Sequence, residues 1–332
     1  MTRRIVFVTG GAGFIGSNIV AKLAEDRELD IVVCDRLHEA ELGKWRNIAK
    51  APIGDFVAPE DMFDWLEKRW RDIELVVHMG AISSTTEPDA DKIIHSNFTL
   101  SRDLFRWCAD RQRRLVYASS ATYGAGEHGF DDDNDYEALA ALRPLNTYGW
   151  SKALFDLFAM RQANRDYAPP QWVGLKFFNV YGPNEEHKHS MKSVASQIWP
   201  KVREGHAVQL FKSYRKDVPD GGQKRDFVYV RDAADVTRWL FDNPQVNGIY
   251  NLGSGEARTF EDMARQVFEA AGKNAQIEYT PMPPAIRDKY QYFTEAKMER
   301  LAAAGYAKPL TPLEEGIGDY VGRFLSQPDS YR

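Results

Sequence analysis

Tyr148 and Lys152 have the types and the spacing of an acid/base pair. Residues four apart lie on one face of a helix, so the lysine ammonium can lie close to the phenolic oxygen. An adjacent cation favours the phenolate and therefore lowers the pKa of a tyrosine. Tyr148 can then take a proton from a substrate hydroxyl while a hydride leaves the same carbon. Such pairs also occur on ordinary surface helices. The surrounding elements therefore decide whether this pair is catalytic.

A further hydroxyl group is available at the end of a strand-like run, 114–120, which closes with Ser119 and Ser120. A strand that ends beside Tyr148 would deliver one of these hydroxyls to the same site. The alternative is that the serines cap the helix that follows. Both serines are candidates for the acid/base set.

The amino-terminal segment indicates what could take the hydride. It reads as a buried strand, a turn, a helix and a second strand, and the turn contains Gly10, Gly13 and Gly16. The first glycine permits a tight turn, the second lets the backbone approach a pyrophosphate, and the third lets the helix lie close to the sheet. The helix begins near Phe14 and presents free N–H groups to phosphates. Asp35 closes the second strand, where an acid can accept hydrogen bonds from an adenosine ribose, so we predict dinucleotide binding.

Alternation of strands and helices predicts the fold class. Apolar strand-like runs at 5–9, 31–35, 75–80, 114–120 and 172–180 are separated by helical patterns near 15–25, 60–70, 90–110 and 149–166. Strands joined by crossover helices form a parallel sheet with helices on both faces. We therefore predict an α/β fold, a doubly wound parallel sheet of the Rossmann type, with ligands beyond the carboxyl ends of the strands.

After residue 180 the chain becomes more polar. The segment 181–225 reads as loop-rich, short strands are expected at 226–232 and 248–254, and two or three helices are expected after Ala257. We predict a dinucleotide-binding domain from residues 1–180 plus 226–256. The remaining residues, 181–225 plus 257–332, are predicted to form a smaller α/β substrate domain.

Composition narrows the class of protein. The chain has 332 residues and a formal net charge of −5, which indicates neither a nucleic-acid partner nor a basic membrane-binding surface. No apolar run approaches the ~20 residues that span a bilayer. Cys34 and Cys108 lack the spacing of metal ligands, so no metal site is expected. A cytoplasmic enzyme is the simplest interpretation.

Several motifs resemble the extended short-chain dehydrogenase/reductase family: TGGAGFIG, YASSATYG and YGWSK. The resemblance implies a Rossmann fold with a Ser or Thr, Tyr148 and Lys152 as the catalytic set. Counting from the strand favours Ser120, whereas counting back from Tyr123 favours Ser119.

Longer stretches are similar to those members of the family that epimerise ADP-heptose: HMGAISSTTE (78–87), FFNVYGPNEEHKHSMKSVA (177–195) and KRDFVYVRDAADV (224–236). This similarity covers nearly the whole chain. It implies inversion of C6 of ADP-heptose through a transient ketone and hydride return, for lipopolysaccharide inner-core synthesis. It also implies bound NADP, with NAD as the alternative, and a homo-oligomer, a pentamer in the family.

The resemblance assigns roles to individual positions. Around the cofactor it places Gly10, Gly13, Phe14, Ile15, Gly16, Asp35, Arg36, Lys44, Gly80, Ala81, Ser83, Asn97, Tyr148, Lys152, Val180 and Lys188. Around the substrate it places Asn179, Ser190, Gln197, Phe211, Arg225 and Tyr290. Gln197 stands where the family has a histidine. A guanidinium suits a diphosphate, and we expect Asp226 to orient that of Arg225.

Lys188 matches the second acid/base of the family. Inverting a carbon that no carbonyl acidifies requires oxidation and hydride return to the opposite face, and one tyrosine serves one face well. A second proton carrier is therefore useful. From the residues alone, Lys188 is a solvated loop cation, and His187 and His189 are rivals because a histidine titrates near neutrality.

Three alternatives stay open from the sequence. Asp35 favours NAD because its charge repels a 2′-phosphate, whereas Arg36 and Lys44 favour NADP. Another nucleotide-sugar 4-epimerase or a dehydratase of the family is the second enzyme class, although Ser120-Ala121-Thr122 lacks the acid pair that a dehydratase needs. A catalytically silent nucleotide-binding regulator is the third, but such proteins usually lose the tyrosine or the lysine.

Overall fold

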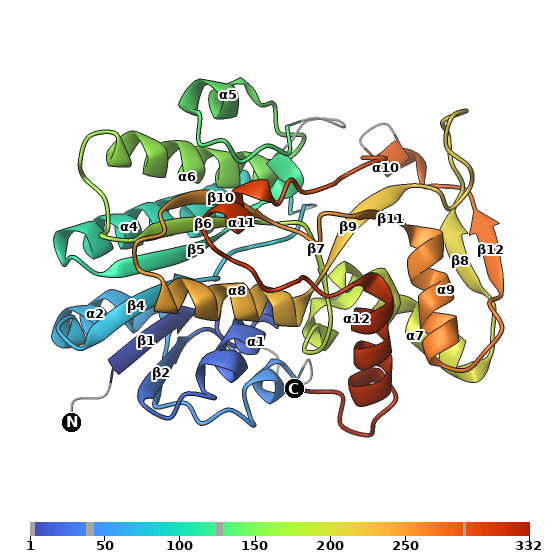
Figure 1. Cartoon of the computed structure of the whole chain (residues 1–332), viewed down its shortest axis with the longest axis horizontal. Coiled ribbons are helices and arrows are strands. Elements are labelled where there is room, and N and C mark those ends of the chain that lie inside the picture. The colour runs from blue at the N-terminus through green and yellow to red at the C-terminus, as the bar shows by residue number, and fades with distance from the viewer. Residues whose placement is uncertain (1–3, 38–42, 86, 124–128, 288–289) are drawn as a thin grey trace.

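Seven strands form one parallel sheet at the centre of the computed structural model (Figure 1), which describes residues 4–37, 43–85, 87–123, 129–287 and 290–332. Their spatial order is β10-β6-β5-β4-β1-β2-β3, and every neighbouring pair is parallel. The strands are β1 (Arg4–Thr9), β2 (Leu29–Cys34), β3 (Asp55–Val57), β4 (Ile73–His78), β5 (Arg114–Ser120), β6 (Trp172–Phe177) and β10 (Gly248–Leu252). The prediction of a doubly wound parallel sheet is confirmed.

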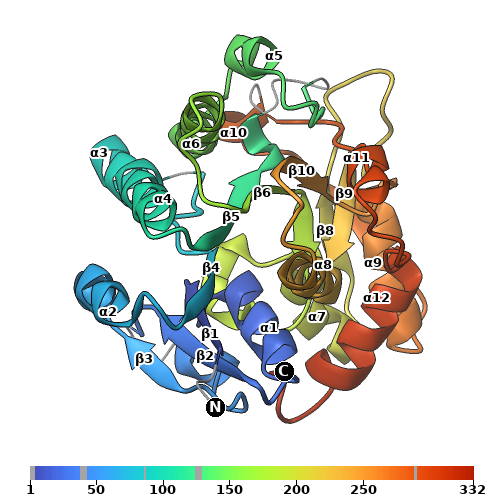
Figure 2. The same cartoon turned by 60° about the vertical axis from the view of Figure 1, so that its left-hand side comes forward.

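Helices cover both faces of this sheet (Figure 2). Val6 and Val8 of β1 pack with α1 (Phe14–Leu23) and α8 (Val230–Asp242) on one face. Phe7 points to the other face, which is covered by α2 (Met62–Arg69), α4 (Leu100–Asp110) and α6 (Thr147–Ala163). The predicted helix at 90–110 consists of α3 (Ala90–Ile94), a π-helical turn η4 (His95–Thr99) and α4. Successive side chains of a strand point to opposite faces of the sheet. Because helices cover both faces, the strand residues are apolar on both sides.

The strand order reverses at β1: β2 and β3 follow on one side, and β4, β5 and β6 follow on the other. The loops after β1 and β4 therefore diverge and leave a crevice beyond the carboxyl ends of the strands. Gly10 has a φ of 63°, and a Cβ at this position would lie 2.6 Å from the nitrogen of Gly80. A Cβ on Gly16 would lie 2.1 Å from the carbonyl oxygen of Gly10. Only glycine therefore permits this turn and the close start of α1.

A second group of elements lies beyond one end of the sheet (right in Figure 1). It contains α7 (Val194–Glu204), α9 (Phe260–Ala270), α12 (Leu313–Tyr320), the strand pair β8 (Val208–Phe211) and β12 (Ile277–Thr280), and the sheet β11 (Ala257–Thr259), β9 (Lys224–Tyr229) and β7 (Asn179–Tyr181). They share an apolar cluster that includes Trp199, Val202, Leu210, Phe227, Val267, Phe268, Ile317 and Tyr320. Of the predicted segment 226–256, β10 joins the seven-stranded sheet and β9 does not. The division into two domains stays a prediction.

Several elements differ from the expectations. Segment 181–225 is not mainly loop, because it contains α7, β8 and the 3₁₀ helix η6 (Glu186–Met191). Pro200 lies inside α7, and a proline within a helical pattern usually indicates the end of a helix. The described part of the tail has four α-helices rather than two or three, since α10 (Pro284–Arg287) and α11 (Glu299–Ala303) are too short for a readable pattern.

Short elements complete the fold. They are α5 (Tyr136–Ala141), the 3₁₀ helices η2 (Lys44–Asn47), η3 (Pro59–Asp61) and η5 (Ala121–Tyr123), and the π-helical turn η7 (Val321–Leu325). Thr86 and Gly124, which belong to two of the quoted motifs, lie outside the described residues. Among the helices that are described, none is long and apolar enough to cross a bilayer.

Candidate active site

A cleft of about 730 Å³ lies at the carboxyl ends of β1, β4, β5 and β6. Most of the predicted site residues line it: Gly10, Gly13, Phe14, Ile15, Gly16, Asp35, Lys44, Gly80, Ala81, Ser83, Ser119, Ser120, Tyr148, Lys152, Asn179, Val180 and Lys188. The structure places another group outside the lining: Arg36, Asn97, Ser190, Gln197, Phe211, Arg225 and Tyr290. The parallel sheet thus brings residues from distant parts of the chain to one edge.

Tyr148 lies in the first turn of α6 and forms a hydrogen bond with the side chain of Ser120. Burial raises the pKa of Tyr148, and the hydrogen bond with Ser120 lowers it. The expected lowering by Lys152 is wrong for this structure, because the ammonium of Lys152 donates instead to the carbonyl oxygen of Ala118 at 2.9 Å. The partner that stabilises the phenolate here is a hydroxyl.

Lys152 is buried one turn further along α6. Burial lowers its pKa to about 8, and the charge of Asp156 opposes that change. A lysine with this pKa exchanges its proton near neutral pH, which an exposed lysine does not.

The two serine candidates point to different sides of β5. Ser120 meets Tyr148, whereas the hydroxyl of Ser119 donates to the buried carboxylate of Asp156. Successive side chains of a strand alternate between its faces, so only one of the two can contact the tyrosine. The geometry therefore favours Ser120 as the hydroxyl beside Tyr148.

Asn97 supports the cleft from behind. Its side chain accepts from the backbone nitrogen of Ile82 at 2.8 Å and donates to the carbonyl oxygen of Ile82 at 3.0 Å. It also donates to the hydroxyl of Ser151 at 3.1 Å. Asn97 therefore ties the loop after β4 to α6 from outside the cleft, whereas the resemblance placed it around the cofactor.

The end of β2 carries a carboxylate that is already held by the protein. Asp35 accepts from the backbone nitrogen of Ala12 at 2.9 Å and from the ammonium of Lys44 at 2.6 Å. Arg36 is exposed and its guanidinium donates to Glu60 at 3.1 Å. Two carboxylates and two cations, paired as Asp35 with Lys44 and Glu60 with Arg36, thus lie together where an adenosine ribose is expected.

Lys188 and His187 line the cleft from η6, whereas His189 is exposed and lies outside the lining. The ammonium of Lys188 lies 5.5 Å from the centre of the Phe14 ring. Burial lowers the pKa of Lys188, and the carboxylate of Glu185 opposes this. Burial also lowers the pKa of His187 to about 4, so that ring is neutral at physiological pH. Of the three rivals, Lys188 is the partly buried cation that faces the cleft.

Arg225, Phe211 and Tyr290 form a cluster next to the cleft. The guanidinium of Arg225 lies 5.2 Å from the Tyr290 ring and 5.5 Å from the ring of Phe260, which itself lines the cleft. The rings of Phe211 and Tyr290 lie 6.4 Å apart. Three of the predicted substrate residues are therefore brought together.

Asp226 does not orient Arg225 as expected. Its oxygens accept from the backbone nitrogens of Ser254, Gly255 and Ala296 and from the hydroxyl of Ser254. Adjacent residues of β9 point to opposite faces, which separates this carboxylate from the guanidinium. Asp226 instead holds the 254–255 loop.

Gln197 and Ser190 are both exposed. The amide of Gln197 donates to the carbonyl oxygens of Ser190 at 3.2 Å and Lys192 at 2.7 Å. Gln197 therefore supports the segment that carries Lys188 rather than the cleft itself.

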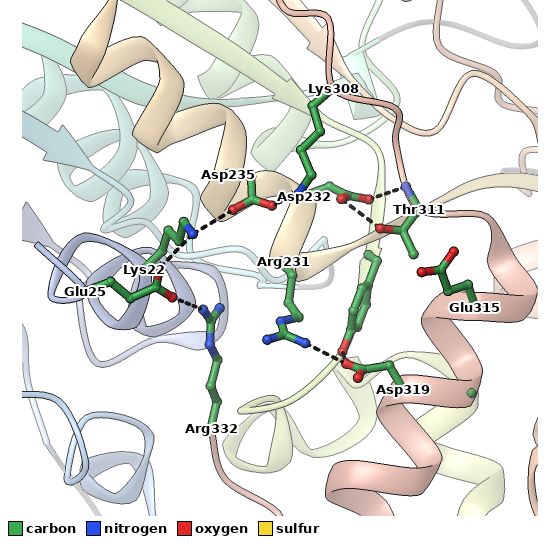
Figure 3. A pocket seen from close by; sticks show the side chains of 12 residues that line it. Lys22, Glu25, Arg231, Asp232, Asp235, Lys308, Thr311, Glu315, Asp319 and Arg332 are labelled. Atoms are coloured by element: carbon green, nitrogen blue, oxygen red, sulfur yellow. Dashed lines mark hydrogen bonds and ion pairs between the residues drawn. The ribbon is translucent and has the colours of Figure 1, made fainter.

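A second cavity, of about 490 Å³, lies between α1, α8 and α12 (Figure 3). Its charged side chains pair with one another: Lys22 with Asp235 at 3.4 Å, Arg231 with Asp319 at 3.0 Å, and Arg332 with Glu25 at 3.6 Å. This cavity has no Tyr–Lys pair and no glycine turn, so the candidate active site is the larger cleft. Among the described residues, no group of three or more His, Cys, Asp and Glu is arranged to hold a metal ion.

Comparison with known proteins identifies the family of this chain. A model of the NAD dependent epimerase/dehydratase family matches residues 6–253. The chain belongs to this family. It is 44% identical over 336 residues to an ADP-L-glycero-D-manno-heptose-6-epimerase of Fusobacterium nucleatum, an alignment that covers 98% of this chain and 100% of that one. The resemblance found in the motifs is confirmed at nearly full length.

Solved structures of the epimerase/dehydratase family share the fold. The crystal structure of ADP-L-glycero-D-manno-heptose-6-epimerase from Helicobacter pylori has a TM-score of 0.81 and 27% identity, covering 97% of this chain and 96% of that one. UDP-glucose 4-epimerase from Thermus thermophilus, in complex with NAD, has a TM-score of 0.72 and 28% identity, covering 96% of this chain and 98% of that one.

Sequence reasoning missed one residue that lines the cleft and one that lies behind it. Phe260, at the start of α9, lines the cleft and contacts Arg225. No local motif in the sequence predicted this position. Asp156 lies four residues after Lys152 on the same helix, so the spacing that identified the tyrosine and the lysine could have found it.

Proposed function

We propose that this protein is an epimerase that inverts C6 of ADP-D-glycero-β-D-manno-heptose to give the L-glycero epimer, a step of lipopolysaccharide inner-core synthesis. Full-length similarity to epimerases of that name supports the substrate. The observation that carries the reaction is the cleft itself, which is lined by Tyr148 of α6, Ser120 of β5 and Lys188 of η6.

The glycine turn fits a dinucleotide. Gly10 and Gly16, where a Cβ would clash, leave the backbone at the start of α1 uncovered by side chains. Asp35 stands at the end of β2. Gly10, Gly13 and Phe14 would hold the pyrophosphate, and Asp35 the adenosine ribose. A nicotinamide group bound there supplies a hydride acceptor that later returns the hydride.

The residues of the chain then handle the protons. Tyr148 takes the proton of the C6 hydroxyl as C6 becomes a ketone, and the hydrogen bond with Ser120 stabilises the phenolate. Lys188 exchanges the corresponding proton when the other epimer forms. Arg225, held between Phe260 and Tyr290, binds the diphosphate of the substrate.

The direct test is to mix the purified protein with ADP-D-glycero-β-D-manno-heptose and to resolve the two C6 epimers. We expect a mixture of both epimers without added oxidant or reductant, because the cofactor is regenerated in each turnover. Substrate that stays unchanged even at high enzyme concentration would contradict the proposal. UDP-sugars should then be tested.

We further propose that the cofactor is NADP. The ammonium of Lys44 neutralises Asp35 at 2.6 Å, and the exposed guanidinium of Arg36, which donates to Glu60, lies at the next residue. These cations offset the repulsion between a carboxylate and a 2′-phosphate. Nucleotide released by denaturation should therefore be mostly NADP, measured by chromatography. NAD alone would contradict this, as in the Thermus thermophilus enzyme, whose structure contains NAD.

A variant separates the two nucleotides further. Arg36→Ala should weaken NADP binding about tenfold, the loss of roughly one charge-assisted hydrogen bond, and NAD binding little. Arg69→Ala, on the exposed side of α2, is the matched control and should change neither. Equal losses for both nucleotides would show that Arg36 does not contact the 2′-position.

Three further statements are proposals on the same footing. The homo-oligomer, a pentamer by family resemblance, awaits a measurement of mass in solution. A cytoplasmic location agrees with two buried free cysteines, because thiols stay reduced there. The division into a cofactor domain and a substrate domain agrees with the separate apolar clusters on the large sheet and around α7, α9 and α12.

A further inference from the structure

Asp156 is a carboxylate in the middle of the protein, with 0% of its surface exposed. It lies on α6 four residues after Lys152 and eight after Tyr148, so the three side chains share one face of the helix. It lies outside the lining of the active-site cleft, and the mechanism above does not use it.

Three hydroxyl groups donate to this carboxylate. Tyr117 donates to one oxygen at 2.9 Å, and Tyr123 donates to the other at 2.7 Å, together with Ser119. The donors come from β5 and η5. Burying a carboxylate without partners is costly, and here the three hydroxyl groups compensate that cost. The carboxylate therefore joins the end of β5 firmly to α6.

A buried cation of β6 acts on the same carboxylate. Lys176 of β6 is 1% exposed, lies 4.7 Å from the centre of the Tyr123 ring and donates to the carbonyl oxygen of Asp131 at 2.7 Å. The pKa of Asp156 is raised because burial outweighs its three hydroxyl partners and Lys176, which oppose that change. The three donors and the nearby cation are the groups that favour its ionised form.

Two consequences reach the active site. Ser119 donates to Asp156, and the next residue, Ser120, bonds to Tyr148 in the first turn of the same helix, so the carboxylate fixes against α6 the strand end that carries Ser120. The negative charge also acts on Lys152, whose ammonium is buried and donates only to a backbone carbonyl oxygen in the contacts described. A buried ammonium without a counter-charge would lose its proton easily.

We propose that Asp156 is a positioning residue for the Tyr148–Lys152 pair: it joins β5 to α6, and its negative charge keeps the buried Lys152 in its ammonium form. The activity assay for this proposal rests on the proposed function, whereas the titration of Lys152 can be measured whatever the reaction is. Lys152 faces Tyr148 and Asp156 on its own helix, Ala118 on β5 and His78 on β4.

His78 does not compete for this role. Its two ring nitrogens are bound to Thr9 at 2.6 Å and to Ser101 at 2.8 Å. Burial, followed by the charge of Lys152, lowers its pKa to about 3, so it is neutral in the physiological range. Within the described part of the chain, Asp156 is thus the anion that acts on Lys152.

The test compares Asp156→Asn with Asp156→Glu in the cofactor-loaded protein. Asn keeps the volume and removes the charge, and Glu keeps the charge. The pKa of Lys152 is read by NMR of lysine labelled with ¹³C at Cε, with Lys152→Ala used to assign the signal. The second readout is the pH profile of kcat for C6 epimerisation.

The ammonium form exists below the pKa of Lys152 and is lost as the pH rises through it. In Asp156→Asn this pKa should fall by about one unit or more, so activity above pH 8 should fall about tenfold and recover toward pH 6. Asp156→Glu should restore most of the shift. A lysine titration and a basic limb that are both unchanged in Asp156→Asn would overturn the proposal.

Two outcomes are kept apart by this design. A wild-type protein that does not epimerise ADP-heptose contradicts the proposed function, while the NMR titration still decides the role of Asp156. If Asp156→Asn does not fold, the double variant Tyr117→Phe with Tyr123→Phe removes two donors and keeps both rings. It should favour the neutral carboxyl and lower the pKa of Lys152 in the same direction, and an unchanged titration there would count against the proposal.

Discussion

Replacing Tyr148 by Phe should lower the rate of C6 epimerisation by at least about 10²- to 10⁴-fold, the usual contribution of a general acid–base group. Phe keeps the ring in the first turn of α6 but removes the oxygen that bonds to Ser120. Cofactor retention should change little, because the glycine turn and Lys152 remain. The measurements are kcat from resolved epimers and the amount of nucleotide that co-purifies.

Tyr167→Phe is the matched control. The hydroxyl of Tyr167 donates to Asp110 on the surface at 2.8 Å, away from the cleft, so its loss should leave turnover unchanged. Turnover in Tyr148→Phe that equals that of the control would remove Tyr148 from the mechanism. A loss of bound cofactor in Tyr148→Phe would instead indicate that the hydroxyl mainly holds the nucleotide.

Lys188→Met should produce the second large loss. Methionine preserves much of the apolar stem but has no proton to transfer, so net epimerisation should fall by a similar factor of roughly 10²–10⁴. A half-reaction that uses one face should survive far better. A substrate analogue with an aldehyde at the terminal carbon provides this test, because its dismutation does not require inversion of C6.

Lys201→Met, on the exposed side of α7, is the control for the loss of one lysine charge. Normal epimerisation by Lys188→Met would make this residue a binding cation only. His187, the other basic side chain of η6 in the cleft, would then be the next to replace. Equal losses in epimerisation and dismutation would instead show that Lys188 serves both faces or only holds the substrate.

Local patterns in the sequence were sufficient for the cofactor half of the site. Gly10 and Gly16 were readable because a positive φ and a contact with the next turn constrain residues close in sequence. Tyr148 and Lys152 were readable because helix geometry relates residues four apart. The parallel strands were readable because a strand buried on both faces is a continuous apolar run.

Features that depend on contacts between distant segments were not readable. Which serine meets Tyr148 depends on the register of β5 against α6, and the two counts along the chain disagreed. The partner of Asp226 depends on which face of β9 it occupies, and the structure gives it the 254–255 loop instead of Arg225. Helix α7 was hidden because Pro200 lies inside it, and a proline within a helical pattern usually indicates the end of a helix.

The sequence by itself therefore determined the fold class, the glycine turn and the Tyr–Lys pair, because each depends on backbone constraints within a few residues. Only the tertiary structure decided that Ser120 rather than Ser119 faces the tyrosine and that Lys188 rather than His189 faces the cleft. It also placed the buried Asp156 beside the donors of β5. These choices depend on which faces of separate elements are packed together, and burial then sets the charge of each group.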